Sequence, residues 1–126
     1  MTAVLDTSVF VAQEQRGLDV ELEGPMVVSA ITVSELALGA TAADDPDVRA
    51  IRRHTLLRVI DEFDVLDVDT AIGLRYGELM TAQRSRGRRP SVQDTLIAAT
   101  AIEHNVPLLT QDIDFLAFEG LDVILV

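Results

Sequence analysis

The sequence has no cysteine and no lysine, and only 4% of its residues are aromatic. Without cysteine the chain has no disulfide, thiol catalysis or cysteine-ligated zinc, and it is compatible with a reducing cytoplasm. Apolar residues still make up 48% of the chain, so its core must be built mainly from Leu, Ile, Val and Ala. All ten basic residues are arginine, which removes any chemistry that needs a lysine amine.

The sequence also lacks a long apolar run and a basic leader. The apolar stretch LIAATAI (96–102) is far shorter than the roughly 20 residues that cross a bilayer. The opening MTAVLDTSV has no basic segment ahead of its apolar residues, so we expect no signal peptide. We therefore expect a cytoplasmic protein without membrane contact. A chain of 126 residues fits one compact domain, expected to span residues 1–126.

The net charge is −11, which argues against a broad basic face that binds duplex nucleic acid. It does not argue against a metal-dependent nuclease, because such an active site is itself acidic. One basic segment, RSRGRRP (84–90), stands out and contains Arg84, Arg86, Arg88 and Arg89. Arginine forks suit phosphate oxygens, so these four residues are candidates for RNA binding. The alternative is that they are solvated charges at a helix C-terminus.

Short β-branched runs alternate with longer helical segments along the chain. The runs predict strands at 3–6, 26–30, 63–68, 107–110 and 122–126. The segments between them predict helices at 8–15, 32–43, 46–60, 70–86 and 92–104, with a short turn near 113–118. This order predicts a mainly parallel five-stranded sheet with helices on both faces. The helices at 32–43 and 46–60 follow each other without a strand between them.

Four acidic residues attract attention: Asp6, Glu35, Asp94 and Asp112. Each has a purely local explanation as part of a helix cap. Asp6 and Asp112 each follow a strand and can cap the next helical turn. Glu35 lies three residues after Thr32, as in a T-x-x-E capping box, and Asp94 lies three after Ser91 in a similar S-x-x-D pattern.

Taken together, the four caps predict more than helix starts. In a parallel α/β sheet, the carboxyl ends of the strands and the N-termini of the following helices share one edge. Four caps after strands would gather four carboxylates there, and carboxylates at close range repel one another. A bound hard cation, Mg²⁺ or Mn²⁺, is the usual way in which proteins resolve this repulsion. A helix cap and a metal ligand can therefore be the same residue.

Three segments, VLDTSVFVA (4–12), ITVSELALGA (31–40) and SVQDTLIAATAIEHNVPLLTQDIDF (91–115), resemble the PIN domain. More narrowly, they resemble the small toxin ribonucleases of VapBC-type toxin–antitoxin pairs. The resemblance covers the whole chain, with the motifs in the family's order. It implies a three-layer α/β/α sandwich and an acidic pocket that binds Mg²⁺ or Mn²⁺.

The resemblance places the family's acids on Asp6, Glu35, Asp94 and Asp112. It implies RNA hydrolysis with Asp6 and Asp94 as direct metal ligands and Asp112 as a third ligand, directly or through water. Glu35 would complete the metal shell or orient and deprotonate the attacking water. Asp114, a less regular participant, would join Asp112 at a second metal. Thr7 and Thr110 match hydroxyl positions that support the acids, and Gln93 and Gln111 are departures that affect substrate contacts alone.

The family resemblance also implies protein partners. An antitoxin would wrap the chain and place a basic residue in the acidic pocket, which suits the net charge of −11. A homodimer is also implied, with ITVSELALGA and the helix pair after it as a candidate surface.

Two alternatives compete with the nuclease hypothesis. A phosphatase or phosphotransfer domain also places aspartates at strand ends, but DTSVF lacks the second aspartate of D-x-D-x-[TV], and the lysine used by both groups is absent. A catalytically silent PIN-like scaffold is the other alternative. The presence of all four acids argues against it.

Overall fold

The computed structural model describes residues 1–19 and 24–126. The elements in chain order are β1 (Ala3–Leu5), α1 (Thr7–Arg16), β2 (Met26–Ser29), α2 (Ala30–Ala42), α3 (Pro46–Glu62), β3 (Asp64–Leu66), α4 (Thr70–Ser85), α5 (Val92–Glu103), β4 (Leu108–Thr110), the 3₁₀ helix η1 (Ile113–Ala117) and β5 (Val123–Leu125). Every expected strand and helix is present, and the ends differ from the expected ones by at most two residues.

The five strands form one sheet in the order β3-β2-β1-β4-β5, and every neighbouring pair is parallel. Val4 of the central strand β1 pairs with Val27 of β2 and with Leu108 of β4. The predicted helix pair is confirmed, because α2 and α3 both lie between β2 and β3 in the chain. Since β1 and β4 are neighbours, the segments that follow them meet at one edge of the sheet.

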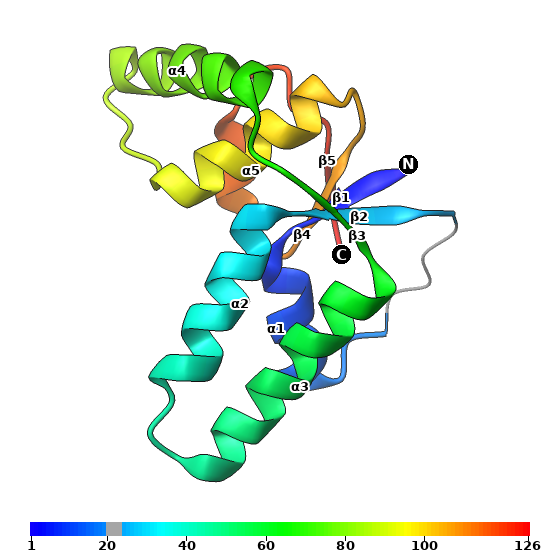
Figure 1. Ribbon diagram of the computed structural model, residues 1–126. Coiled ribbons are helices and arrows are strands. Elements are labelled where there is room, and N and C mark those ends of the chain that lie inside the picture. The colour runs from blue at the N-terminus through cyan, green and yellow to red at the C-terminus, as the bar shows by residue number, and fades with distance from the viewer. Residues whose placement is uncertain (20–23) are drawn as a thin grey trace.

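Helices cover both faces of this sheet (Figure 1). Helices α1, α2 and α3 lie on one face, and α4 and α5 lie on the other. Successive side chains of β1 point to opposite faces, as the period of a strand requires. Val4 packs in the core with Ile97 and Phe115, whereas Leu5 packs in the core with Phe10 and Val59. The predicted three-layer α/β/α sandwich is therefore confirmed.

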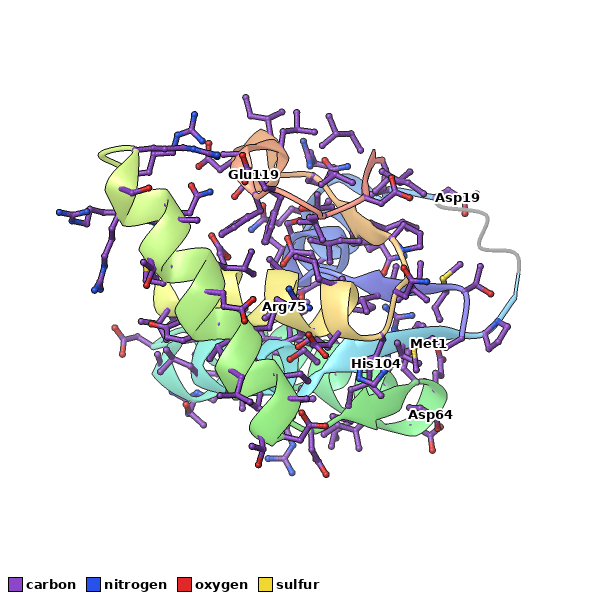
Figure 2. The ribbon with its side chains drawn as sticks, turned by 90° about the horizontal axis from the view of Figure 1, so that it is seen from above. Met1, Asp19, Asp64, Arg75, His104 and Glu119 are labelled. Atoms are coloured by element: carbon purple, nitrogen blue, oxygen red, sulfur yellow. The ribbon has the colours of Figure 1, made fainter. Side chains whose placement is uncertain are left out.

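Helix α5 is held by buried packing and by an ion pair to α4. Its residues Ala98, Ala99 and Ala101 are fully buried, and small side chains of this kind let the helix lie close to the sheet and to α4. On the outside, Arg75 of α4 binds Glu103 of α5 with a nitrogen-to-oxygen distance of 2.7 Å, and Figure 2 shows Arg75 lying over α5. This packing holds α5, whose first turn carries one of the candidate acids, against the rest of the fold.

None of the helices formed by residues 1–19 and 24–126 combines the length and apolar character needed to cross a membrane.

Candidate active site

An open cleft of about 370 Å³ lies where β1 and β4 end. All four acids singled out in the sequence line it: Asp6, Glu35, Asp94 and Asp112. They arrive from four different segments, namely the start of α1, the second turn of α2, the first turn of α5 and the segment after β4. The predicted gathering of the carboxylates at one edge of the sheet is therefore present in the structure.

Asp6 is the most deeply placed of the four acids, with 4% of its surface exposed. It caps α1 as predicted, because its Oδ2 atom accepts a hydrogen bond from the backbone N–H of Ser8 at 3.4 Å. The same oxygen accepts from Ser8 Oγ at 2.6 Å and from Thr110 Oγ1 at 2.9 Å. No hydrogen bond from a described residue reaches the other oxygen, Oδ1, which leaves it available to a ligand.

Two hydroxyl groups tie the ends of β1 and β4 together. Thr110 Oγ1 donates to Asp6 and also accepts from the backbone N–H of Asp112 at 3.0 Å. Ser8 Oγ donates to Asp6, lies 3.2 Å from Thr110 Oγ1 and accepts from the backbone N–H of Gln111 at 3.0 Å. Thr110 therefore bonds to Asp6, which follows β1, and to the backbone of Asp112, which follows β4, and so fixes the two acids relative to each other. The sequence prediction included Thr110 but missed Ser8.

Replacing Thr110 with valine should lower both stability and activity. Thr110 is fully buried, so the substitution leaves the Asp112 N–H and one oxygen of Asp6 without this partner. We expect the free energy of unfolding, measured by urea denaturation, to fall by about 1–3 kcal/mol. Thr100→Val is the matched control, because Thr100 is equally buried but bonds only to the Leu96 carbonyl of its own helix at 2.8 Å. An equal loss of stability in the two variants would contradict a special role for Thr110.

Glu35 faces the cleft from α2, and its position is set by Thr7. Thr7 Oγ1 donates to Glu35 Oε1 at 2.7 Å and lies 3.1 Å from Thr32 Oγ1. Partial burial raises the pKa of the Glu35 carboxyl, the Thr7 hydrogen bond lowers it, and the charge of Asp6 raises it further. The net pKa lies above the ordinary value for glutamate. The predicted supporting position of Thr7 agrees with this contact.

The capping box predicted at Thr32 is wrong. Helix α2 begins at Ala30, and its N-cap is Ser29, whose side chain accepts from the backbone N–H of Ile31 at 3.0 Å. Thr32 is therefore inside the first turn of the helix and fully buried. Ser29 and Thr32 are both residue types that favour an N-cap, and the sequence prediction considered only Thr32. Glu35 consequently stands in the second turn of α2 and reaches the cleft as a helical side chain.

Asp94 is the third residue of α5, and Ser91 caps this helix by accepting from the Asp94 N–H at 3.0 Å. This part of the predicted S-x-x-D cap is confirmed. We expected Asp94 at this edge of the sheet because its helix would follow a strand. That reason is corrected, because α5 follows α4 in the chain. Burial, together with the charges of Asp6, Glu35 and Asp112, raises the pKa of the Asp94 carboxyl to about 6. The four carboxylates therefore repel one another across the cleft.

The donor set of the cleft fits a hard cation. Carboxylate and hydroxyl oxygens are the ligands that Mg²⁺ and Mn²⁺ take in proteins, and Mg²⁺ usually keeps several waters and binds through one or two carboxylates. Within residues 1–19 and 24–126, no three acidic or histidine side chains stand close enough to enclose an ion by themselves. The acids are instead spread around an open cleft, which suits a partly hydrated ion that is shared with a substrate.

Asp112 and Asp114 line two different spaces in the structure. Asp112 Oδ1 caps η1 by accepting from the Asp114 N–H at 2.9 Å, as predicted, and Asp112 lines the cleft. Asp114 is exposed on η1 and lines a neighbouring groove of about 550 Å³ instead of the cleft. A shared second-metal site for these two acids remains a prediction, and one that requires Asp114 to turn toward the cleft.

The four predicted RNA-binding arginines lie in different surroundings. Arg88 and Arg89 line the same groove as Asp114, next to the acidic cleft. Arg86 forms an ion pair with Glu119, and Figure 2 shows Glu119 beside the C-terminal end of α4. Arg84 is exposed in the last turn of α4. A basic residue that the sequence prediction missed, Arg16, lines the cleft itself and donates to the side chain of Gln111.

The fold and the cleft define an α/β domain whose central parallel strands end in a ring of carboxylates. The family model of the PIN domain matches residues 3–121. This chain therefore belongs to the PIN domain family.

Two comparisons involve proteins of Mycobacterium tuberculosis. The chain is 40% identical over 119 residues to Ribonuclease VapC5, with 93% of this chain and 87% of that protein covered. It is 36% identical to a chain in the crystal structure of VapBC-5, a member of the VapBC family of toxin–antitoxin systems. The two structures superimpose with a TM-score of 0.83 over 100% of this chain and 98% of that chain.

A third comparison concerns the fold alone. The structure of VapBC2 from Rickettsia felis bound to a promoter DNA fragment superimposes with a TM-score of 0.88 over 100% of this chain and 99% of that chain, at 24% identity.

Proposed function

We propose that this protein is a metal-dependent endoribonuclease that acts as the toxin of a toxin–antitoxin pair. The observation that carries the proposal is the cleft at the carboxyl ends of β1 and β4, lined by Asp6, Glu35, Asp94 and Asp112. The proposal draws support from the 40% identity to a protein named as a VapC ribonuclease. It extends the activity named for that relative to this chain.

Asp6 and Asp94 would hold Mg²⁺ or Mn²⁺ directly, and Asp112 would do so directly or through a water. When bound, the cation would polarise the phosphoryl oxygens and make a water more acidic. The protein's contribution is to keep these carboxylates in place before the substrate arrives. For Asp6 this is done by Ser8 and Thr110, which occupy Oδ2 and leave Oδ1 available.

Glu35 is the candidate proton acceptor for the attacking water. Thr7 occupies its Oε1 atom, while Oε2 accepts no hydrogen bond from a described residue. Its raised pKa moves the carboxylate toward the range in which a general base works at neutral pH. Attack in line with the departing 3′ oxygen would give one product with a 5′-phosphate and one with a 3′-hydroxyl. Arg88 and Arg89, in the groove beside the cleft, would bind flanking phosphates.

The net charge of −11 suits a basic protein partner. We extend to this chain the toxin–antitoxin assembly named for VapBC-5, with an antitoxin that places a basic residue in the cleft. A homodimer is also proposed. The predicted surface on α2 and α3 exposes five large apolar side chains, Leu38, Val48, Ile51, Leu57 and Ile60. The cytoplasm, where RNA and such a partner meet, is the proposed place of action.

The direct test is to incubate the purified protein with structured RNAs in Mg²⁺ and in EDTA. We expect cleavage in Mg²⁺, none in EDTA, and full recovery when Mg²⁺ is added back in excess. Labelling of the product ends should identify a 5′-phosphate. Cleavage that continues in EDTA, or products with a 2′,3′-cyclic phosphate, would contradict the mechanism.

A further inference from the structure

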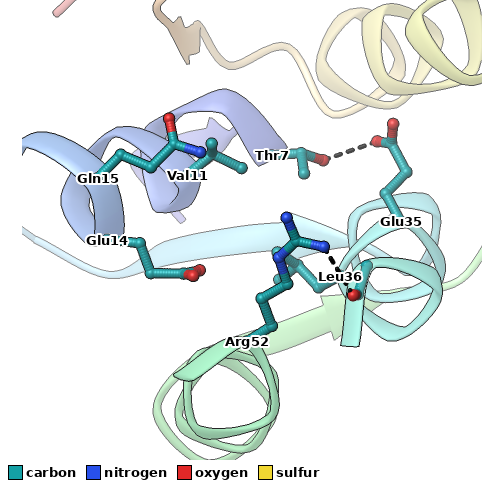
Figure 3. Close-up of a pocket in the computed structure, with 8 residues that line it drawn as sticks. Thr7, Val11, Glu14, Gln15, Glu35, Leu36 and Arg52 are labelled. Atoms are coloured by element: carbon teal, nitrogen blue, oxygen red, sulfur yellow. Dashed lines mark hydrogen bonds between the residues drawn. The ribbon is translucent and has the colours of Figure 1, made fainter. Parts of the chain in front are cut away.

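A second cavity opens beside the acidic cleft, among α1, α2 and α3 (Figure 3). Its volume is about 250 Å³, which is below the ~300–1,000 Å³ typical of sites for drug-sized ligands. Four residues that line it, Thr7, Val11, Gln15 and Glu35, also line the cleft. The two spaces are therefore continuous, and a group that enters this side pocket stays attached to whatever occupies the cleft.

Two opposite charges face each other in the side pocket without forming an ion pair. Glu14 points inward from α1 and Arg52 from α3, and Figure 3 shows the two side chains on opposite sides of the space. The ion pairs found among the described residues include neither of them. Arg52 Nη1 donates to the Gly39 carbonyl at 3.0 Å, which holds the guanidinium against α2. Its remaining N–H groups have no acceptor within residues 1–19 and 24–126.

The rest of the lining is suited to a flat ring. Val11 and Leu36 supply apolar surface, and Leu36 is firmly packed, with 6% exposure. The pocket thus offers apolar surface, a carboxylate acceptor from Glu14 on one side and a guanidinium donor from Arg52 on the other, while Thr7, Gln15 and Glu35 line the part that it shares with the cleft. Apolar walls with a few placed polar groups are typical of sites that select one ligand by its hydrogen-bonding edge.

Guanine is the nucleobase that matches this pair of groups. Its Watson–Crick edge presents two neighbouring donors, N1–H and the N2 amino group, to which a carboxylate can bind with both oxygens. Its O6 and N7 atoms are acceptors, and arginine binds them with two N–H groups. Adenine, cytosine and uracil each place an acceptor beside their donor on the Watson–Crick edge, and that acceptor would face the carboxylate of Glu14. Guanine therefore satisfies both charges at once.

We infer that this side pocket binds the guanine base of the nucleotide next to the scissile phosphate, with Glu14 and Arg52 reading its two edges. The inference rests on the proposed ribonuclease activity and adds a substrate preference to it. Proteins usually recognise RNA sequence through single-stranded bases that are splayed out of the helix, and a pocket that adjoins the cleft can accept such a base while its phosphate lies among the acids.

The first test compares short single-stranded RNAs that differ in one nucleotide beside the cut. We expect guanine to be preferred there by roughly tenfold or more, which is the discrimination that one two-bond contact supplies. Inosine, which lacks the N2 amino group, should fall between guanine and adenine. Glu14→Gln and Arg52→Gln should each reduce the preference severalfold. Arg53→Gln is the matched control, since Arg53 is the next residue of α3 and is exposed.

The second test does not depend on cleavage. Guanosine 5′-monophosphate and cytidine 5′-monophosphate are titrated separately into ¹⁵N-labelled protein, and the amide shifts of α1 and α3 are followed. We expect the guanine nucleotide alone to shift amides near Glu14 and Arg52, and Glu14→Gln to remove the effect. Because Glu14 accepts no hydrogen bond from a described residue, this variant should fold normally, and a thermal melt verifies it.

These outcomes separate the failure of the pocket from the failure of the enzyme. Cleavage without guanine preference, together with equal shifts from both nucleotides, overturns the pocket and leaves the nuclease intact. Guanine-specific shifts without any RNA cleavage support the pocket and count against the nuclease. If neither nucleotide shifts these amides and Arg52→Gln weakens only the binding of a protein partner, the side pocket is a protein-docking site and the inference is wrong.

Discussion

Asp94→Asn should abolish RNA cleavage and, at neutral pH, raise the melting temperature of the metal-free protein. The loss of cleavage follows from the proposed role of Asp94 as a metal ligand. The gain in stability follows from its pKa, which burial and the charges of Asp6, Glu35 and Asp112 raise from 3.8 to about 6. Removing the charge relieves this repulsion, and asparagine keeps nearly the same shape. One substitution would thus separate function from stability.

The direction of the pH dependence follows from proton binding. Between about pH 4 and pH 6 the folded protein holds a proton on Asp94 that the unfolded chain has lost, so stability falls as the pH rises through this range. Above about pH 6 the ionised carboxylate opposes folding, and the asparagine variant should gain about 1–2 kcal/mol after allowance for solvent screening. Near pH 4 this gain should disappear.

Thermal melts in EDTA at neutral pH and at about pH 4 measure the effect. Asp69→Asn is a suitable control, because Asp69 caps α4 from an exposed position and asparagine is an equally good cap. We expect the control to leave both the melting temperature and cleavage unchanged. An Asp94→Asn protein that melts below the wild type at neutral pH would show that Asp94 stabilises the metal-free fold.

Asp112→Asn should also abolish cleavage, whereas Asp114→Asn should only weaken it. Asp112 lines the acidic cleft and raises the pKa of Asp94 by its charge, while Asp114 is exposed in the neighbouring groove. Asparagine can replace Asp112 as the cap of η1, so the fold should persist in both variants. The two variants therefore differ mainly in the place from which a negative charge is removed, which is the cleft for Asp112→Asn and the neighbouring groove for Asp114→Asn.

Cleavage rates of the two proteins on the same RNA, with circular dichroism spectra to verify folding, test this division. Residual activity of Asp114→Asn that exceeds that of Asp112→Asn by at least tenfold is the expected result. Equal and complete loss in both would place Asp114 in the reaction, as a ligand that turns into the cleft when substrate binds.

Much of this architecture follows from local sequence signals. Asp6 and Asp112 each close a short β-branched run and cap the next helical turn, so their positions could be predicted from the pattern of strands and caps. The meeting of these two acids follows from parallel strand order, which the alternation of strands and helices indicates. For these two residues, the local capping signals and the observed strand order lead to the same positions.

Other parts of the site depend on tertiary structure that local signals do not contain. Ser29 and Thr32 are both plausible caps, and the burial of Thr32 beside Thr7 decides between them. Arg16 reaches the cleft because α1 runs along it, and Glu14 faces Arg52 across the side pocket because α3 packs near α1. Sequence spacing places these residues on helices but does not specify which helix faces will meet.

The acidic cleft reconciles the net charge of −11 with the proposed action on RNA. A bound divalent cation would offset part of the negative charge of the carboxylates, while Arg88 and Arg89 in the adjacent groove would attract the RNA backbone. A catalytically silent PIN-like scaffold has no need of this arrangement. Metal binding therefore distinguishes the nuclease from the scaffold independently of any choice of RNA.

The decisive measurement is the melting temperature of the wild type and of Asp94→Asn, each in EDTA and in saturating Mn²⁺. A ligand present at about 100 times its dissociation constant stabilises the folded state by about 2.7 kcal/mol. We expect Asp94→Asn to melt higher than the wild type in EDTA, and the order to reverse in Mn²⁺ because the wild type alone is stabilised by the ion. If Mn²⁺ leaves the melting temperature of the wild type unchanged, or raises the melting temperatures of both proteins equally, the four carboxylates do not form a metal site. That result would contradict the metal-dependent nuclease hypothesis.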